Sequence, residues 1–250
     1  MNINSDINIL GGLPDLNLIT HFLFKTGVDS AIQPGHYTYT SIKTDKSVKR
    51  FERAINGTFL KFKGRESEYL IKSILASESV SHGSLLMLFW NASLNNDLLH
   101  YLNTRVYFPA FYSGRLIIKT DDAEACIKEL RETEESIKGW SANTVYTVSY
   151  KYLALLKKFN LMEGGLHKKI LHPYLSDKMF VLFIYWIKAI EPKPNLLESS
   201  WLKYSFCEQS VFIDRVLQKK FAEFYRLTYT GDQLKIETSL PYEKIYYATK

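Results

Sequence analysis

The residues best suited to chemistry in this sequence are lysines, gathered along one predicted helix and the segment after it. Residues 137–172 hold one acid, Glu163, against six lysines, a local net charge of +5. The six are Lys138, Lys151, Lys157, Lys158, Lys168 and Lys169. Ammonium groups bind phosphates by electrostatic attraction and hydrogen bonds, with no chemical reaction. This segment therefore predicts contact with a polyanion rather than catalysis.

A predicted helix over residues 142–159 positions these lysines. Ser141 is a favourable N-cap, and Asn160 suits the left-handed conformation that ends many helices. Apolar residues between them repeat at helical spacings of three and four, which predicts one face packed on a core. They are Val145, Val148, Tyr152, Leu155 and Phe159.

The opposite face of this helix is the candidate contact surface, and the helix contains no carboxylate. Its residues are Asn143, Tyr146, Thr147, Tyr150, Ala154 and Lys157, flanked by Lys151 and Lys158. Small hydrogen-bonding groups near the helix start suit base edges or phosphates, and lysines further along suit the DNA backbone. We expect Lys168 and Lys169, in segment 166–172, to extend this surface.

The preceding segment has the opposite charge. Residues 121–135 hold seven acids against Lys128 and Arg131. An acidic helix that faces away, followed by a basic helix that faces out, is typical of a helix-turn-helix on double-stranded DNA. Two other interpretations stay open, namely a structural helix with a solvated basic face and a surface for a protein partner.

A second basic region lies near the N-terminus. Residues 43–65 hold eight lysines and arginines against Asp45 and Glu52. A helix is predicted over 44–62, capped by Thr44 or Asp45. Four of these cations lie on the side of the helix away from its phenylalanines, and they are a candidate second DNA contact. They are Lys46, Lys49, Arg50 and Arg53.

The sequence lacks the common catalytic signatures. It contains no G-x-G-x-x-G, no G-x-x-x-x-G-K-[ST], no G-x-S-x-G and no H-E-x-x-H motif. Its six histidines are scattered, with His167 and His172 interpreted as edges of a wing, and Cys126 and Cys207 stand alone. We therefore expect no enzymatic activity, no cofactor and no metal site.

Helical periodicity dominates the remaining chain. One helix is predicted after Pro14 up to about Gly27. Another is predicted to begin at a Thr120 cap and to turn four residues toward the core: Ala123, Ile127, Leu130 and Ile137. Further helices are predicted over 66–77, 84–93, 96–108 (up to Pro109), 176–190, 196–205 and 208–224. The last has Ile213, Val216, Leu217, Phe221 and Phe224 on one side. Alternation over 226–238, around Gly231 and Asp232, predicts a β-hairpin, which either forms a second winged helix or ends an ordinary α+β domain.

The expected fold is mainly α: a multi-helical protein with helix-turn-helix or winged-helix-like elements and a small C-terminal β-hairpin. The predicted domains are 1–115 (helical), 116–175 (helix-turn-helix-like) and 176–250 (helical, with the hairpin). The net charge of +6 and 46% hydrophobic content fit a globular protein with an anionic partner.

The most hydrophobic run, MFVLFIYWI at 179–187, is predicted to be a buried helix rather than a membrane span. Nine helical residues rise about 13 Å, whereas a span must cross about 30 Å of hydrocarbon. The N-terminus lacks the pattern of a secretory signal, and the two isolated cysteines suit a reducing compartment. We expect a cytoplasmic protein without membrane contact.

Several local patterns resemble the BrxA family, a core component of the BREX bacteriophage-exclusion systems. The resemblance rests on GWSANTVYTVSYKYLALLKKFNLMEG, on GGLPDLNLITHFLF with FERAINGTFLKF, and on HPYLSDKMFVLFIYWIKAI, and covers about residues 10–190. Trp140, Ser141 and Thr144 match the family's Trp-Ser-x-x-Thr pattern, and we interpret their role as structural.

The resemblance implies a helical, non-enzymatic DNA-binding protein that acts beside a methyltransferase, a phosphatase-like protein and ATPases. One alternative is a scaffold for the methyltransferase or ATPase without DNA contact, marked by exposed aromatic residues around Trp201 and Tyr204 or Tyr246 and Tyr247. Another is a dimeric transcription regulator, but the sequence shows no heptad repeat for a dimer, so we expect a monomer.

Overall fold

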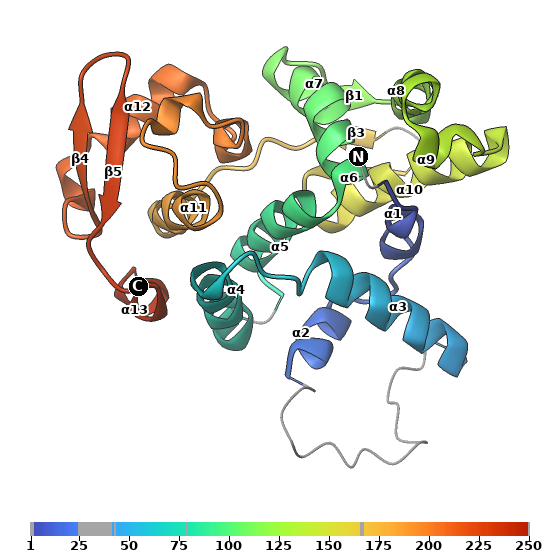
Figure 1. The fold of residues 1–250 in the computed structure, drawn as a ribbon, viewed down its shortest axis with the longest axis horizontal. Coiled ribbons are helices and arrows are strands. Elements are labelled where there is room, and N and C mark those ends of the chain that lie inside the picture. Colours follow the sequence, from blue (N-terminus) through green and yellow to red (C-terminus); the bar gives the residue numbers. More distant parts are fainter. Residues whose placement is uncertain (1–2, 25–41, 43, 79, 166–167, 250) are drawn as a thin grey trace. The chain divides into compact units, whose positions relative to one another are not determined.

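The computed structural model describes residues 3–24, 42, 44–78, 80–165 and 168–249 (Figure 1). The protein is mainly α-helical, as the sequence predicted, and two small antiparallel sheets accompany the helices. The predicted helix stop at Gly27, the basic residue Lys43 and the predicted wing-edge residue His167 lie outside the described residues.

The chain packs as two compact units. The first comprises Met1–Lys61 with Ser79–Leu171, and the second comprises Phe62–Glu78 with His172–Lys250. The division into domains 1–115, 116–175 and 176–250 expected from the sequence follows different boundaries and stays a prediction.

The first unit contains the predicted DNA-contact helices. Its elements are α1 (Asp6–Leu10), α2 (Asn17–Phe24), α3 (Asp45–Thr58), α5 (His82–Asn95), α6 (Asp97–Leu102), a π-helix (Asn103–Tyr107), α7 (Phe108–Tyr112), β1 (Ile117–Ile118), α8 (Thr120–Thr133), α9 (Glu135–Lys138), α10 (Ala142–Lys158), β2 (Met162–Glu163) and β3 (Lys168–Ile170).

The second unit is built around one apolar helix. Its elements are α4 (Arg65–Glu78), α11 (Asp177–Ile190), the 3-10 helices Leu196–Glu198, Leu202–Ser205 and Lys219–Phe221, α12 (Gln209–Val216), β4 (Tyr225–Tyr229), β5 (Leu234–Thr238) and α13 (Tyr242–Ala248). The helix α13 was not predicted from the sequence.

The helix α1, also not predicted, packs between α3 and α10 (Figure 1). Its C-cap, Gly11, lies so close to α10 that a Cβ there would stand 2.3 Å from the backbone oxygen of Lys151. Only glycine allows this approach, because any side chain would overlap the neighbouring backbone.

The helix α3 ends earlier than predicted, at Thr58 rather than residue 62. Two asparagine amides on α5 take the backbone carbonyl groups at this end: Asn91 donates to Phe59 and Lys61, and Asn95 donates to Thr58 and Lys61. These bonds hold the chain in its turn out of the helix. The N-cap is Thr44, one of the two predicted, whose hydroxyl accepts from the Ser47 N–H.

Helical structure continues through Pro109, where the sequence predicted a stop. The π-helix Asn103–Tyr107 precedes α7, and Pro109 lies at the second residue of α7. The Phe108 N–H bonds back to the Asn103 carbonyl oxygen in the π-helix, whereas Pro109 has no N–H to donate, so the change from π-helix to α7 lies where the proline interrupts the ladder of hydrogen bonds. The next helix, α8, begins at Thr120, and its N-cap is Lys119. The prediction that Thr120 caps this helix is therefore wrong by one residue.

The helix α11 forms the core of the second unit, and every residue from Met179 to Ile187 is buried. Its start at the Ser176 cap and its end near residue 190 confirm the sequence prediction. No described helix has the length and apolar content needed to cross a membrane.

The hairpin β4–β5 pairs Leu227 with Ile236 and Tyr229 with Leu234, which confirms the register expected from alternation. The predicted helix 208–224 is wrong, because α12 ends at Val216 and Gln218 is extended (φ −65°, ψ 129°). Leu217, expected on the inner face, is 42% exposed.

The close approach of α1 to α10 gives a stability prediction. Gly11→Ala should lower the free energy of unfolding by about 1–3 kcal/mol, because the added methyl group overlaps the Lys151 backbone. Gly57→Ala is the matched control: Gly57 is exposed within α3 with open space around it, so alanine there should stabilise by about 0.5–1 kcal/mol. Urea denaturation measures both, and equal effects of the two substitutions would contradict the packing.

Candidate nucleic-acid interface

Two helices and a small sheet carry the candidate interface. The helices α8 and α10 pack together, joined by the short α9, and the Arg131 side chain donates to the Trp140 carbonyl oxygen at 3.1 Å. Strand β3 pairs with β1 on one side and with β2 on the other, so the sheet order is β1–β3–β2. The sheet therefore ties the segment before α8 to the hairpin after α10.

The helix α10 follows the sequence prediction closely. Ser141 caps it by accepting from the Thr144 N–H at 3.1 Å, and Asn160 is left-handed with φ 58°. All five residues of the predicted apolar seam are fully buried: Val145, Val148, Tyr152, Leu155 and Phe159. The Tyr152 hydroxyl donates to Asn103 Oδ1 on the π-helix at 3.1 Å, which fixes α10 against the core.

The first half of the outer face of α10 is open. Asn143 is exposed, and the rings of Tyr146 and Tyr150 are 52% and 46% exposed. Thr147 is half-buried, and its hydroxyl donates to the Asn143 carbonyl oxygen at 2.7 Å, so that donor is already used within the helix.

The second half of this face is partly covered, contrary to the prediction of an open surface. Contact with α1 leaves Lys151 half-buried, and Lys158 is half-buried as well. Burial, together with the charge of Lys151, lowers the pKa of the Lys158 ammonium.

A concave site, here called the lysine pocket, lies at this half of α10. It has a volume of about 430 Å³. Its lining consists of Gly11, Tyr150, Ala154, Lys157, Lys158, Gly164, Gly165 and Lys168. The Lys157 ammonium donates to the Gly164 carbonyl oxygen at 2.8 Å, which links α10 to the turn after β2.

The structure separates two neighbouring lysines that the sequence placed on one open surface. Along β3, Lys168 and Ile170 are buried while Lys169 is exposed, the alternation expected of a strand. Lys168 is only 7% exposed, and its ammonium lies 4.8 Å from the centroid of the Tyr150 ring. The expectation that Lys168 lies on an open surface is therefore wrong, because it forms a wall of the lysine pocket.

The second basic region lies in the same unit as α10. All four predicted cations of α3 are exposed: Lys46, Lys49, Arg50 and Arg53. The helix α1 packs against both α3 and α10, so it lies between the two helices that carry these cations. The structure thus brings the two surfaces into one unit without joining them directly.

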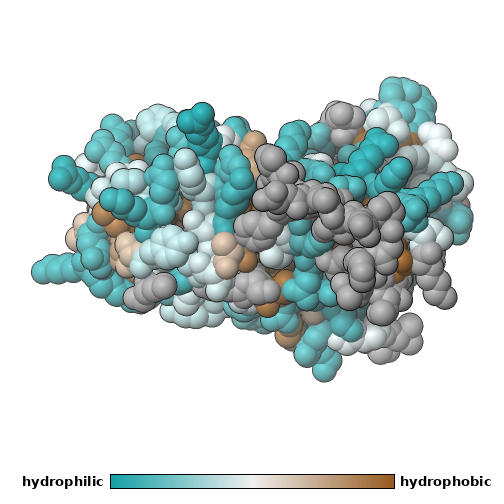
Figure 2. Space-filling model, turned by 90° about the horizontal axis from the view of Figure 1, so that it is seen from below, coloured by the Kyte–Doolittle hydropathy of each residue, from teal (hydrophilic) through white to brown (hydrophobic). Residues whose placement is uncertain are grey.

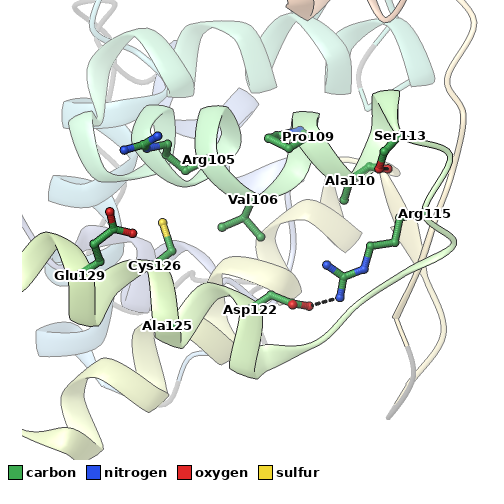
Figure 3. A pocket seen from close by; sticks show the side chains of 10 residues that line it. All are labelled: Arg105, Val106, Pro109, Ala110, Ser113, Arg115, Asp122, Ala125, Cys126 and Glu129. Atoms are coloured by element: carbon green, nitrogen blue, oxygen red, sulfur yellow. Dashed lines mark hydrogen bonds and ion pairs between the residues drawn. The ribbon is translucent and has the colours of Figure 1, made fainter.

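A second pocket, which the sequence reasoning missed, lies between α7 with its π-helix and α8 (Figure 3). Its volume is about 470 Å³, its middle is formed by Val106 and Pro109, and Arg115 pairs with Asp122 at one end at 2.7 Å. Cys126 lies in its wall. Burial, and less strongly the charge of Glu129, raises the pKa of this thiol to about 11.

The aromatic surface expected of a scaffold is largely buried. Trp201 packs edge-on against Trp186 with ring centroids 5.4 Å apart, and Tyr204 and Tyr246 are buried. Tyr247 is 50% exposed. On the face that Figure 2 draws, hydrophilic side chains cover most of the described surface and hydrophobic ones form small separate spots.

Comparison with known proteins places the chain in a family. The BrxA family model matches residues 42–184, more than half of the chain, including α3, α8, α10 and the β2–β3 hairpin. The chain belongs to the BrxA family. BrxA proteins are components of BREX phage-defence systems, which confirms the resemblance drawn from the sequence. No curated protein and no solved structure matches the chain.

In the described part of the chain, no group of three or more histidine, cysteine, aspartate or glutamate side chains is placed so that it could hold a metal ion. The Cys126 thiol is protonated at neutral pH because of its raised pKa, which makes it a weak nucleophile.

The raised pKa predicts slow thiol chemistry at Cys126. In a Cys207→Ser variant, alkylation of Cys126 by iodoacetamide at pH 8 should be at least roughly a hundredfold slower than that of free cysteine. Its rate should keep rising about tenfold per pH unit above pH 8 and level off only above about pH 11. Mass spectrometry of the modified protein measures the rate, and fast alkylation at pH 8 would contradict the protonated thiol.

Proposed function

We propose that this protein is a non-enzymatic, cytoplasmic DNA-binding component of a BREX phage-defence system, and that α10 and the β2–β3 hairpin contact duplex DNA mainly through phosphates. The observation that carries the proposal is the acid-free outer face of α10, which is held on a rigid core; the exposed Lys169 on β3 is a second cation of the same unit. A cationic surface without local neutralisation attracts DNA phosphates.

The order of elements supports the same proposal. The element order β1–α8–α9–α10–β2–β3, with β1 paired to β3, is similar to that of a winged helix in which the short α9 lies in the turn between the two main helices. In helix-turn-helix proteins the second helix enters the major groove while the first crosses the backbone. In this proposal α10 enters the groove and the hairpin follows the adjacent phosphates.

The side chains of the outer face favour phosphate contacts over base reading. Lys157 and Lys169 present ammonium groups, whereas the Thr147 hydroxyl already donates within α10. Two tyrosine rings occupy much of the exposed first half of the helix. In this proposal the base edges are left to Asn143 and the tyrosine hydroxyls, and preference among DNA sequences would come mainly from shape and deformability.

The cationic face of α3 is the proposed second contact. Its four exposed cations lie in the same unit as α10, and one duplex could reach both by passing over α1. Membership of the BrxA family implies other defence components as partners, and we propose that these are the methyltransferase and ATPase that act on the same DNA. We propose that the protein alone is a monomer.

Fluorescence anisotropy with a labelled duplex of about 30 base pairs, from 50 to 250 mM salt, tests the proposal. The logarithm of the affinity should fall linearly with the logarithm of the salt concentration. Lys157→Glu with Lys158→Glu should reduce the slope by about 1.8, since each phosphate contact contributes about 0.9.

A charge-matched control separates local contact from net charge. Lys72→Glu with Lys128→Glu changes the charge equally but alters lysines that pair with Glu68 and Glu124 on other helices. These substitutions should leave the slope unchanged. Equal effects of the two pairs would contradict the interface, and absence of binding at 50 mM salt would favour the scaffold.

A further inference from the structure

We propose that the lysine pocket is a binding site for a single phosphate group, held by Lys157, Lys158 and Lys168. The phosphate could come from either of two sources. The first is a phosphodiester of bound DNA, and for this source the inference rests on the proposed function. The other source is a free phosphate or phosphate ester.

The pocket is built from three separate segments of the first unit. The helix α10 supplies Lys157 and Lys158, strand β3 supplies Lys168, and α1 closes one side with Gly11. The contact of Gly11 with the backbone of Lys151 and the bond from Lys157 to the Gly164 carbonyl oxygen hold these segments together. The backbone segments that carry the three lysines are therefore held together before any ligand arrives.

The charge of the pocket is not neutralised by the protein. Its lining includes no carboxylate, and no ion pair to the three lysines occurs among the described residues. Burial, with the charge of Lys157, lowers the pKa of the Lys168 ammonium, and burial also lowers that of Lys158. Such a cluster is unfavourable when empty, because three like charges in one concave site repel one another and no carboxylate of the lining offsets them.

Lys168 is the strongest single pointer to a ligand. It is 7% exposed, its ammonium lies over the Tyr150 ring, and it has no hydrogen bond to another described residue. A cation–π contact with the ring leaves the N–H donors of this ammonium available to a ligand. An ammonium offers three donors, so the cluster suits the several acceptor oxygens of a phosphate.

The size of the pocket fits a phosphate with its attached group. Its volume of about 430 Å³ is far larger than the roughly 30 Å³ that one water occupies in the liquid. There is room for a phosphate together with a sugar or several waters. The exposed part of Tyr150 forms the rim on the side of the open α10 face.

Thermal unfolding with inorganic phosphate as the probe tests the site. The Tm should rise with sodium phosphate at constant ionic strength beyond the rise in sodium chloride, because a ligand of the native state stabilises it. Lys168→Met should raise the phosphate Kd about tenfold or more, since it removes a charge-assisted contact. Lys169→Met, an equal change at the exposed neighbour, should leave it unchanged.

Lys158→Met is a second variant that removes a pocket ammonium from a different element, and it should weaken phosphate binding similarly. Circular dichroism checks that each variant is folded. The inference is overturned if the wild-type protein gains no phosphate-specific stability, or if the Lys168 and Lys169 substitutions change the phosphate Kd equally.

Competition with the labelled duplex at constant ionic strength distinguishes the two phosphate sources. If a DNA phosphodiester occupies the pocket, inorganic phosphate should displace the duplex from the wild-type protein and much less from Lys168→Met. Phosphate binding without duplex binding would support the pocket for a free phosphate while contradicting the proposed function. Duplex binding without phosphate binding, unchanged in Lys168→Met, would overturn the pocket and leave the proposed function standing.

Discussion

The burial of one face of α10 is the interaction on which the rest of the first unit depends. Its apolar seam is fully inaccessible to solvent, and Phe159 at its end packs against Phe59 and Phe89 with ring centroids 5.9 and 5.4 Å apart. Each such side chain contributes roughly 1.5–3 kcal/mol when fully buried. The Tyr152–Asn103 hydrogen bond adds a directional contact in the same core. With one face fixed in this way, the rotation of the helix, and hence the direction of its cationic face, is determined.

A rigid core also allows like charges to stand close together. The lysines of α10 approach Lys168 because the sheet β1–β3–β2 holds that strand beside the helix. Repulsion among them is offset by packing elsewhere, and it favours an anion at the surface. Acidic residues concentrate instead on α8, where Arg115 and Lys128 pair with Asp122 and Glu124. The unit is therefore polarised between two adjacent helices, with the acids on α8 and the lysines on α10.

Local signals were sufficient to predict α10, α11 and the β4–β5 hairpin. Helix caps, helical periodicity and strand alternation depend on residues that are close together in the sequence. They predicted the Ser141 cap, the helix end at Asn160 and the Leu227–Ile236 register. The candidate site was predicted only in part. The exposed positions Asn143, Tyr146 and Lys157 were expected, whereas the partial burial of Lys151 was not.

The missed features depend on contacts between distant residues. The helix α1 has five residues, too few to show a period, and its packing on Lys151 is absent from any local pattern. The strands β1 and β3 have two and three residues, and their pairing decides that Lys168 rather than Lys169 turns inward. The length of α3 depends on Asn91 and Asn95, more than thirty residues away. In each case tertiary packing overrides or completes the local sequence preference.

The most direct test of the central claim is lysine footprinting of the protein with and without a duplex of about 30 base pairs. Acetylation at each lysine is measured by mass spectrometry after a short exposure to the reagent. If α10 and the hairpin lie on DNA, the exposed Lys157 and Lys169 lose reactivity on addition of the duplex, while Lys72 and Lys128 keep theirs. Unchanged reactivity at Lys157 and Lys169 in the presence of bound duplex would contradict the account.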